Sequence, residues 1–558
     1  MSVEGPGRTV YLLACEPGSD RAREIVPALR AAGHPVRLVA APALAEESEG
    51  RAEERQQLRA ELRAIGAVVR EALETGGALL LADERGALAV PEMMRVLLDE
   101  RGLGWEEAWS RVRAASFARL GSPKSEPSRP FWTTAFLEAE QPRLLEILYE
   151  ANRRHLDEVE ALWPGDLERR RRLSLFREGG TKRLRSGLVA VLASCHADVA
   201  TPWDGPIGET LADVSLLRGR ALHGRPTPVF GRDWLVEGNP ALAALLSEAL
   251  GSGWDADRER LDRLETLAFD SSFRDAFRAV RRLNRQRLAA LVRERGGAEV
   301  DPDSLVDVRV WTGRPQERPL LNLLGLVREH LRVAAGGWRP PAARTVVLAG
   351  PLGARLAPVV WAIADAVGAD LRARPHLRVV VLPDCREEEL RVLAGAADLS
   401  NEPGAAGSGA AGSRALACAI QGAVTLGTRD GAVREIEEAV GAENLFLYGL
   451  GPLETRAWRE GRVYRPQDVY TIDPLVRLTL DALVSRRYAP APGAFDWVRH
   501  ALLDEHDPWL VVADFGPYVH RQDEALAEFA DPLAFTGKAI VTIARARRFW
   551  VDRIELGA

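Results

Sequence analysis

Residues 345–353 read TVVLAGPLG, and this stretch decides the fold class of the chain. The apolar run at 345–349 predicts a buried strand, and the glycines and proline of 350–353 predict a turn into a helix that continues to about Val367. A second apolar run at 377–382 predicts the next strand. A strand, a helix and a further strand in this order indicate a parallel sheet covered by helices.

The first part of the chain repeats this pattern. Runs at 9–14 and 36–41 predict strands on either side of a helix at about 21–32, and 78–81 predicts a further strand that ends in the polar loop 82–86. We therefore expect an α/β protein with two Rossmann-like domains, residues 1–200 and 201–558, that face one cleft. Ligands of such sheets bind at the carboxyl ends of the strands.

Composition narrows the class of protein further. The chain has 558 residues, 46% of them hydrophobic, and a formal net charge of -6, so nothing favours nucleic acid or an anionic membrane as a partner. No run of about 18 apolar residues predicts a membrane span, and the first ten residues do not resemble a signal peptide. Four scattered cysteines and nine scattered histidines lack metal-ligand spacing, so we expect no metal site and a cytoplasmic location.

Helical spacing is clearest between about residues 86 and 164. The apolar stripe there includes Leu144, Leu148, Ala151 and Val159, and His155 lies on the same stripe. We therefore predict that His155 is a packed or half-exposed histidine and not a ligand.

Several longer segments carry a family resemblance. They are ALAVPEMMRVLLDE at 87–100, GLGWEEAW at 102–109, LYEAN at 148–152, WPGDLERRRRLSL at 163–175, RDWLVEGNPALA at 232–243, NLLGLV at 322–327, AADLS at 396–400, GAVTLGTRDGA at 422–432 and ENLFLYGL at 443–450. In this order, from about residue 60 to residue 556, the chain resembles the glycogen and starch (α-glucan) phosphorylases. The resemblance implies a GT-B fold, with a C-terminal helix that crosses back to the first domain. It also implies a homodimer and phosphorolysis of α-1,4-glucan to glucose 1-phosphate.

The reaction of that family needs pyridoxal phosphate bound as a Schiff base to a lysine, within the motif EASGTGNMKF. The matching stretch here is GAAGSRALAC at 409–418, which places Ala417 at the lysine and Gly409 and Ala411 at two glucose-binding positions. Within this stretch, only Gly412 and Ser413 are of the same chemical type as the family residues at their positions. An alanine cannot form an imine, so we expect pyridoxal phosphate to be absent.

The other sites that the resemblance implies also depart from the family pattern. KRIHEYKRQLLN becomes WTGRPQERPLLN at 311–322, so Trp311 and Glu317 stand where lysines are expected, while Arg318 remains and Arg314 is new. A carboxylate in place of a cation reverses the local field beside two phosphates. In the loop LNDTH, Asp83 survives and Arg85 replaces the histidine. Trp311 is predicted to fill part of the cofactor pocket.

Seven residues remain as candidates for binding a ligand or an anion at the carboxyl ends of the strands. They are Asp83, Arg85, Arg314, Arg318, Gly412, Ser413 and Arg414. The Gly-rich loop before Arg414 leads into the start of a helix, where backbone N–H groups can bind an anion. A flexible loop that only allows two domains to pack would have the same sequence pattern. For residues 83–85, a solvent-exposed charged turn that binds no ligand explains the sequence equally well. No catalytic residue is assigned.

Two functions therefore stay open. The first is a phosphorylase-like protein without phosphorolysis that binds α-glucan, a sugar phosphate or another protein. The second is an active hexosyltransferase, either a glycosyltransferase or an α-glucan phosphorylase, that uses different residues.

Overall fold

The computed structural model divides the chain into two compact units, Met1–Pro226 with Arg553–Ala558, and Thr227–Asp552. The sequence analysis predicts the boundary near residue 200. The structure describes residues 9–13, 26, 30, 34–39, 51–81, 86–120, 133–178, 181–200, 205–218, 223–225, 229–311, 317–406, 413–451, 454–455, 457–458, 464–504 and 507–551.

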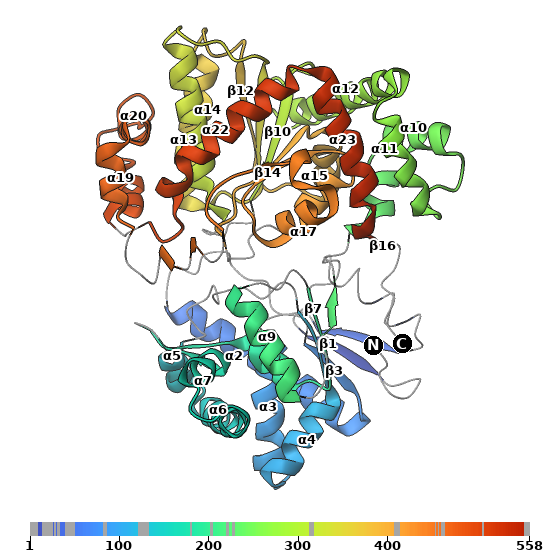
Figure 1. Cartoon of the computed structure of the whole chain (residues 1–558). Helices are drawn as coiled ribbons and strands as arrows, with labels where there is room; N and C mark the ends of the chain where they lie inside the picture. Colours follow the sequence, from blue (N-terminus) through green and yellow to red (C-terminus); the bar gives the residue numbers. More distant parts are fainter. Residues whose placement is uncertain are drawn as a thin grey trace. The chain divides into compact units, whose positions relative to one another are not determined.

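The first unit is built on a parallel sheet of six strands (Figure 1). Its strands are β1 (Val10–Leu13), β2 (Val36–Val39), β3 (Ala78–Leu81), β4 (Ser116–Leu120), β7 (His196–Ala200) and β8 (His223–Arg225). Their order is β2-β1-β3-β4-β7-β8. The strands predicted at 9–14, 36–41 and 78–81 are confirmed in their described residues. β4 is not predicted, because it follows a helix directly and no glycine or proline separates the two.

Helices cover this sheet and form its core. They include α2 (Arg51–Thr75), α3 (Ala89–Arg95), α4 (Trp105–Ala115), α5 (Thr134–Glu140), α6 (Pro142–Leu162), α7 (Leu167–Leu173), α8 (Ser186–Ala193) and α9 (Gly205–Arg218). The apolar stripe of α6 is buried as its spacing predicts, except for Leu162, a predicted member of the stripe at the end of the helix, which is 52% exposed. His155 is buried with it, and its Nε2 lies 3.0 Å from the carbonyl oxygen of Leu173, so the prediction of a packed histidine is confirmed.

The second unit holds another parallel sheet of six strands. These are β10 (Leu305–Val310), β11 (Arg344–Ala349), β12 (Leu377–Leu382), β13 (Leu399–Glu402), β14 (Val424–Gly427) and β15 (Phe446–Leu447). Their order, β12-β11-β10-β13-β14-β15, is the order of Rossmann folds. The stretch TVVLAGPLG forms β11 and the start of α14 (Gly353–Ala369), so the strand, turn and helix predicted from it are confirmed.

Both faces of the second sheet are covered by helices. On β11, Val346 and Leu348 join a cluster with α13 (Pro319–Ala334), α14, α20 (Pro474–Val484) and α22 (Val511–Phe529). Val347 and Ala349 point to the other face and pack toward α12 (Ser271–Glu294) and α15 (Glu387–Ala396). This alternation is why the strand reads as a continuous apolar run.

The last described helix, α23 (Pro532–Ala546), packs within the second unit against α11 (Leu264–Leu267) and α17 (Gly431–Val440). After it, β16 (Trp550–Val551) pairs in parallel with β9 (Val229–Phe230) of the same unit. Within the described part of the chain, no helix is both long and apolar enough to span a bilayer.

Candidate functional site

The strand order of the second unit marks where a ligand site is expected. The chain winds outward from β10 in both directions, through β11 on one side and β13 on the other. Parallel sheets bind ligands outside the carboxyl ends of the strands at such a reversal. Here these ends lead into Trp311 and Glu402, and the helices that follow begin near Arg318 and Arg414.

Glu402 is the last residue of β13, and its carboxylate accepts a hydrogen bond of 2.9 Å from the Ser400 hydroxyl. The pKa of the Glu402 carboxyl is raised to about 7, chiefly by burial and also by the nearby carboxylate of Glu317, while the charge of Arg414 lowers it. A carboxyl with such a pKa can give or take a proton near neutral pH. Glu402 is not among the residues predicted from the sequence. Its position at the end of a buried strand is the feature of the sequence that could have identified it.

Arg318 immediately precedes α13 and is 1% exposed, with a left-handed φ of 49°. Its Nε donates to the carbonyl oxygen of Pro403 at 2.5 Å, and its Nη1 donates to Asp514 Oδ2 of α22 at 2.5 Å. Burial lowers the pKa of the guanidinium, but the charge and the hydrogen bond of Asp514, together with Tyr448 and Asp507, outweigh this effect and raise the pKa. Arg318 therefore joins the ends of β13, α13 and α22, and its charge is already balanced by a carboxylate.

Trp311 follows β10 and is 3% exposed. Its indole Nε1 donates to Asn322 Oδ1 of α13 at 3.1 Å, and its ring belongs to the core between the sheet and α13. The adjacent backbone is tightly packed, because a Cβ on Gly350 would lie 2.1 Å from the Trp311 carbonyl oxygen. The filling of a cofactor pocket by this indole stays a prediction.

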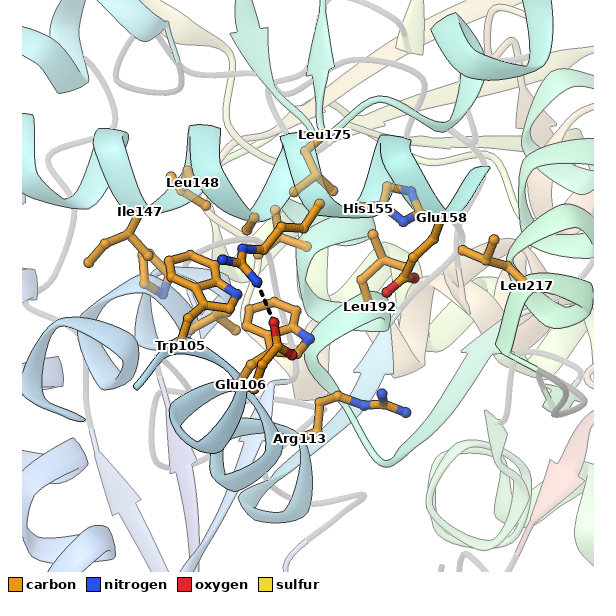
Figure 2. A pocket seen from close by; sticks show the side chains of 16 residues that line it. Trp105, Glu106, Arg113, Ile147, Leu148, His155, Glu158, Leu175, Leu192 and Leu217 are labelled. Carbon is orange, nitrogen blue, oxygen red and sulfur yellow. Dashed lines mark hydrogen bonds and ion pairs between the residues drawn. The ribbon is translucent and has the colours of Figure 1, made fainter. Parts of the chain in front are cut away.

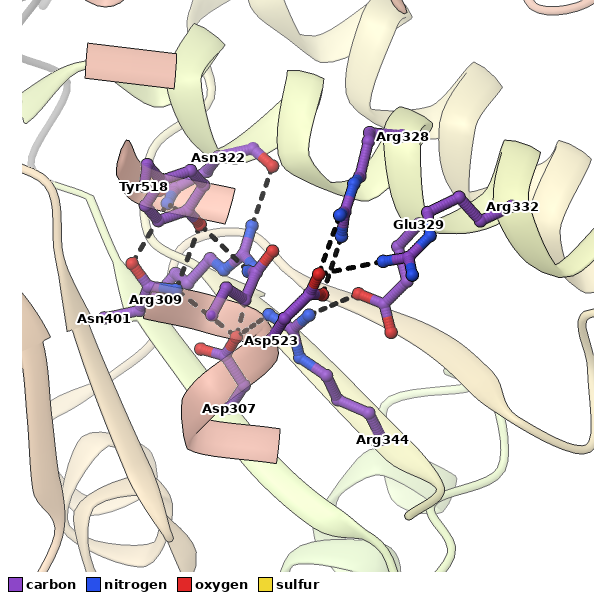
Figure 3. A network of polar contacts seen from close by, with 11 residues as sticks. Asp307, Arg309, Asn322, Arg328, Glu329, Arg332, Arg344, Asn401, Tyr518 and Asp523 are labelled. Carbon is purple, nitrogen blue, oxygen red and sulfur yellow. Dashed lines mark hydrogen bonds and ion pairs between the residues drawn. The ribbon is translucent and has the colours of Figure 1, made fainter. Parts of the chain in front are cut away.

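Beneath these strand ends lies a buried ionic network (Figure 3). Asp307 of β10 accepts hydrogen bonds from Arg309 Nη2 at 3.1 Å and from Arg344 of β11, which also donates to Glu329 of α13. All four side chains are at most 3% exposed. Two guanidinium groups thus face two carboxylates, and the network is electrically neutral.

Amide and phenol groups connect this ionic network to α13 and α22. Asn322 Nδ2 donates to the Tyr518 hydroxyl at 3.0 Å and to Asn401 Oδ1 at 3.2 Å (Figure 3). Asn401 in turn donates to the same hydroxyl at 3.1 Å. The polar residues below the strand ends therefore bond to one another, which fixes helices on the sheet.

The position that the resemblance assigns to the cofactor lysine is apolar. Ala417 lies in α16 (Ser413–Ala419), is 1% exposed, and belongs to a buried hydrophobic cluster with Leu416 and Ile420. The two described lysines are engaged elsewhere. Lys182 pairs with a glutamate of the first unit at 2.8 Å, and Lys538 pairs with one on α22 at 2.8 Å.

The seven candidate residues fall into two groups. Asp83, Arg85, Arg314 and Gly412 lie outside the described residues. Arg318 and Arg414 both lie near the end of β13, because Arg318 bonds to Pro403 and the charge of Arg414 acts on Glu402. Ser413 is the first residue of α16. Among the described residues, no group of three or more His, Cys, Asp or Glu could hold a metal ion.

The fold and these contacts define an α/β protein whose second unit has a Rossmann-type sheet with polar groups at the carboxyl ends of its strands. Residues 63–555 match the model of the carbohydrate phosphorylase family, and the chain belongs to this family. It is 31% identical over 486 residues to the muscle form of glycogen phosphorylase from Bos taurus. It is 33% identical over 491 residues to glycogen phosphorylase from Synechocystis. Each alignment covers 85% of this chain and 57% of the relative, so the chain spans a little over half the length of these proteins.

Proposed function

We propose that this protein is an α-glucan phosphorylase-like protein that binds carbohydrate, or a partner protein, without catalysing phosphorolysis. The observation that carries the proposal is the buried alanine at position 417. Family membership supports a carbohydrate-related role, and the residues at the strand ends of the second unit argue against the family reaction.

The cofactor of the family does not fit the residues present. A Schiff base needs an amine, and the side chain of Ala417 is a methyl group packed among apolar neighbours in α16. Lys182 and Lys538 are each held in an ion pair, and Lys124 lies outside the described residues. We therefore propose that pyridoxal phosphate is absent, and we derive no step through it.

The charge at the strand ends supports the same proposal. A site for two phosphate groups needs several cations, yet Glu317 and Glu402 place carboxylates there and Arg318 is neutralised by Asp514. Glu402 is partly protonated near pH 7, and the carboxylate charge there still offsets the charge of Arg414, which leaves little attraction for two phosphates. A neutral glucan therefore suits these residues better than a sugar phosphate does.

Other parts of the proposal follow from the family rather than from single residues. The GT-B arrangement, the returning C-terminal helix, a homodimer and a cytoplasmic location belong to it. The parallel sheet in each unit supports the GT-B arrangement.

One experiment tests the loss of the cofactor directly. The full chain is incubated with pyridoxal phosphate, reduced with borohydride and analysed by mass spectrometry, and glucose 1-phosphate formation from glycogen and phosphate is measured in parallel. We expect no stoichiometric adduct and no product, but retention of the protein by glycogen in affinity electrophoresis. The variants Lys182→Arg and Lys538→Arg identify adducts on surface amines. A stoichiometric adduct together with product would refute the proposal.

A second function is favoured by one observation, the raised pKa of the Glu402 carboxyl at a strand end. It suits an active hexosyltransferase in which this carboxyl handles a proton. Turnover of glucose 1-phosphate or a sugar nucleotide by the wild type that is abolished in Glu402→Gln would favour this function. Glu388→Gln, an exposed change on α15, is the matched control and should leave such turnover unchanged.

A further inference from the structure

The first unit contains a cavity of about 370 Å³ between α4 and α6 (Figure 2). Its apolar wall includes Ile147, Leu148 and Leu192. None of these residues belongs to the strand-end site of the second unit. The volume lies at the lower end of small-molecule sites, which span about 300–1,000 Å³.

Two indole rings form one side of this cavity. Trp105 and Trp109 are one helical turn apart on α4, with ring centroids 6.4 Å apart and planes 14° apart. Both side chains are only partly buried, and neither indole N–H bonds to a described residue. Because Arg154 lies over the Trp105 ring, the apolar ring surface that remains for a ligand is that of Trp109.

Charged groups of both signs complete the lining. Arg154 lies over Trp105, with its guanidinium carbon 5.0 Å from the ring centroid, and is paired with Glu106. Arg113 of α4 and Glu158 of α6 also line the cavity, and neither forms an ion pair or hydrogen bond with a described residue. These four charges cancel, and one strong donor and one strong acceptor remain available.

We propose that this cavity binds a neutral pyranose sugar, as the terminal residues of an α-glucan or a short oligosaccharide. A sugar ring has an apolar C–H face that can lie on an indole, and its hydroxyl groups both donate and accept hydrogen bonds. The balanced charge disfavours an anion or a cation, and the Arg113 guanidinium and the Glu158 carboxylate can exchange water for the hydroxyl groups of a sugar. The inference rests on the carbohydrate binding proposed above and assigns it to a site.

Calorimetric titration of the full chain with maltose tests this assignment. Trp109→Leu removes an indole but keeps apolar volume, and Glu158→Gln removes the acceptor charge from an exposed position. The matched controls are Trp361→Leu, an indole 45% exposed on α14, and Glu168→Gln, an exposed carboxylate on α7. We expect the cavity variants to weaken maltose binding at least about fivefold and the controls to leave it unchanged.

Hydrogen exchange of 105–113 and 147–158 with and without maltose gives a second measure, and circular dichroism confirms that each variant is folded. Slower exchange in both segments of the wild type supports the site. Equal maltose affinity in all variants would overturn the cavity assignment while leaving carbohydrate binding intact. Failure of the wild type to bind maltose would also overturn the assignment, and retention on glycogen would then decide separately whether the proposed function stands.

Discussion

Asp307→Asn should strongly destabilise the second unit, although it changes a single atom. Asp307 lies in the central strand β10 with no exposed surface and accepts hydrogen bonds from Arg309, Arg344 and Asn401. The asparagine keeps the shape but removes the negative charge. Two buried guanidinium groups would then face the single carboxylate of Glu329.

The magnitude follows from this burial. Removing one partner of a buried ion pair typically costs about 3–5 kcal/mol, because the remaining charge is left uncompensated in a low dielectric. The exposed pair between Asp303 and Arg282, in which the aspartate side chain is 65% exposed, supplies the comparison. Asp303→Asn should cost less than about 1 kcal/mol.

The contribution of Asp307 to the free energy of unfolding depends on pH in a definite direction. The charges of Arg309 and Arg344 outweigh the effect of burial and lower the pKa of Asp307 below its ordinary value of 3.8. The contribution of Asp307 to stability is therefore present above pH 3.8 and is lost as the pH falls through the lower pKa of the folded protein. In Asp307→Asn, the loss of stability that protonation of Asp307 causes at low pH should be absent.

Hydrogen exchange of the segments 305–310 and 344–349 measures the opening free energy of the second unit without assuming that the two units unfold together. Both segments should exchange faster in Asp307→Asn and at the wild-type rate in Asp303→Asn. A double variant, Asp307→Leu with Arg344→Met, replaces charge by apolar volume and should recover part of the loss. If the two single variants cost the same small amount, the reasoning from burial is wrong.

Three further changes can be measured by calorimetric unfolding. Glu402→Gln should stabilise the protein by about 1–3 kcal/mol above pH 7 and by progressively less toward pH 4.5. The reason is that the raised pKa of Glu402 means that folding disfavours the charged carboxyl. Equal effects at both pH values would contradict this prediction. Trp311→Leu should cost about 2–4 kcal/mol, since it leaves a cavity and an unpaired Asn322 oxygen, and a cost below 1 kcal/mol would show that the core refills. Gly350→Ala should cost more than about 2 kcal/mol, because φ is 97° and the Cβ would meet the Trp311 carbonyl, whereas Gly368→Ala within α14 should be neutral or stabilising; similar values for the two would refute the steric argument.

The strands of the second sheet were predictable to different degrees. The runs at 345–349 and 377–382 are apolar and bounded by turn residues, so pattern alone locates β11 and β12. In contrast, β10 contains Asp307 and Arg309, and charged residues normally argue against a buried strand. Their burial becomes possible only because Arg344 comes from the next strand and Glu329 from a helix packed on the sheet.

The same limit applies to the candidate site. The family resemblance singles out Arg318 as a retained cation, but its partner Asp514 lies 196 residues further along the chain. No local pattern indicates that this charge is already balanced. Glu402 was missed for a related reason, because its raised pKa depends on burial and on the carboxylate of Glu317, which comes from a distant part of the chain.

Scaffold and chemistry are carried by different residues in this protein. The helices of the second unit are fixed by apolar clusters and by the network around Asp307, both beneath the strand ends. Among the described positions where the sequence departs from the family pattern, Trp311 and Glu317 lie between β10 and α13, and Ala417 of α16 adds apolar surface to the core. Changes at such positions can remove a reaction at little cost to the fold, so similarity over most of the chain fixes the family and leaves the reaction open. A sugar site built only from residues of the first unit, such as Trp109 and Glu158, depends on none of the altered positions and can function without phosphorolysis.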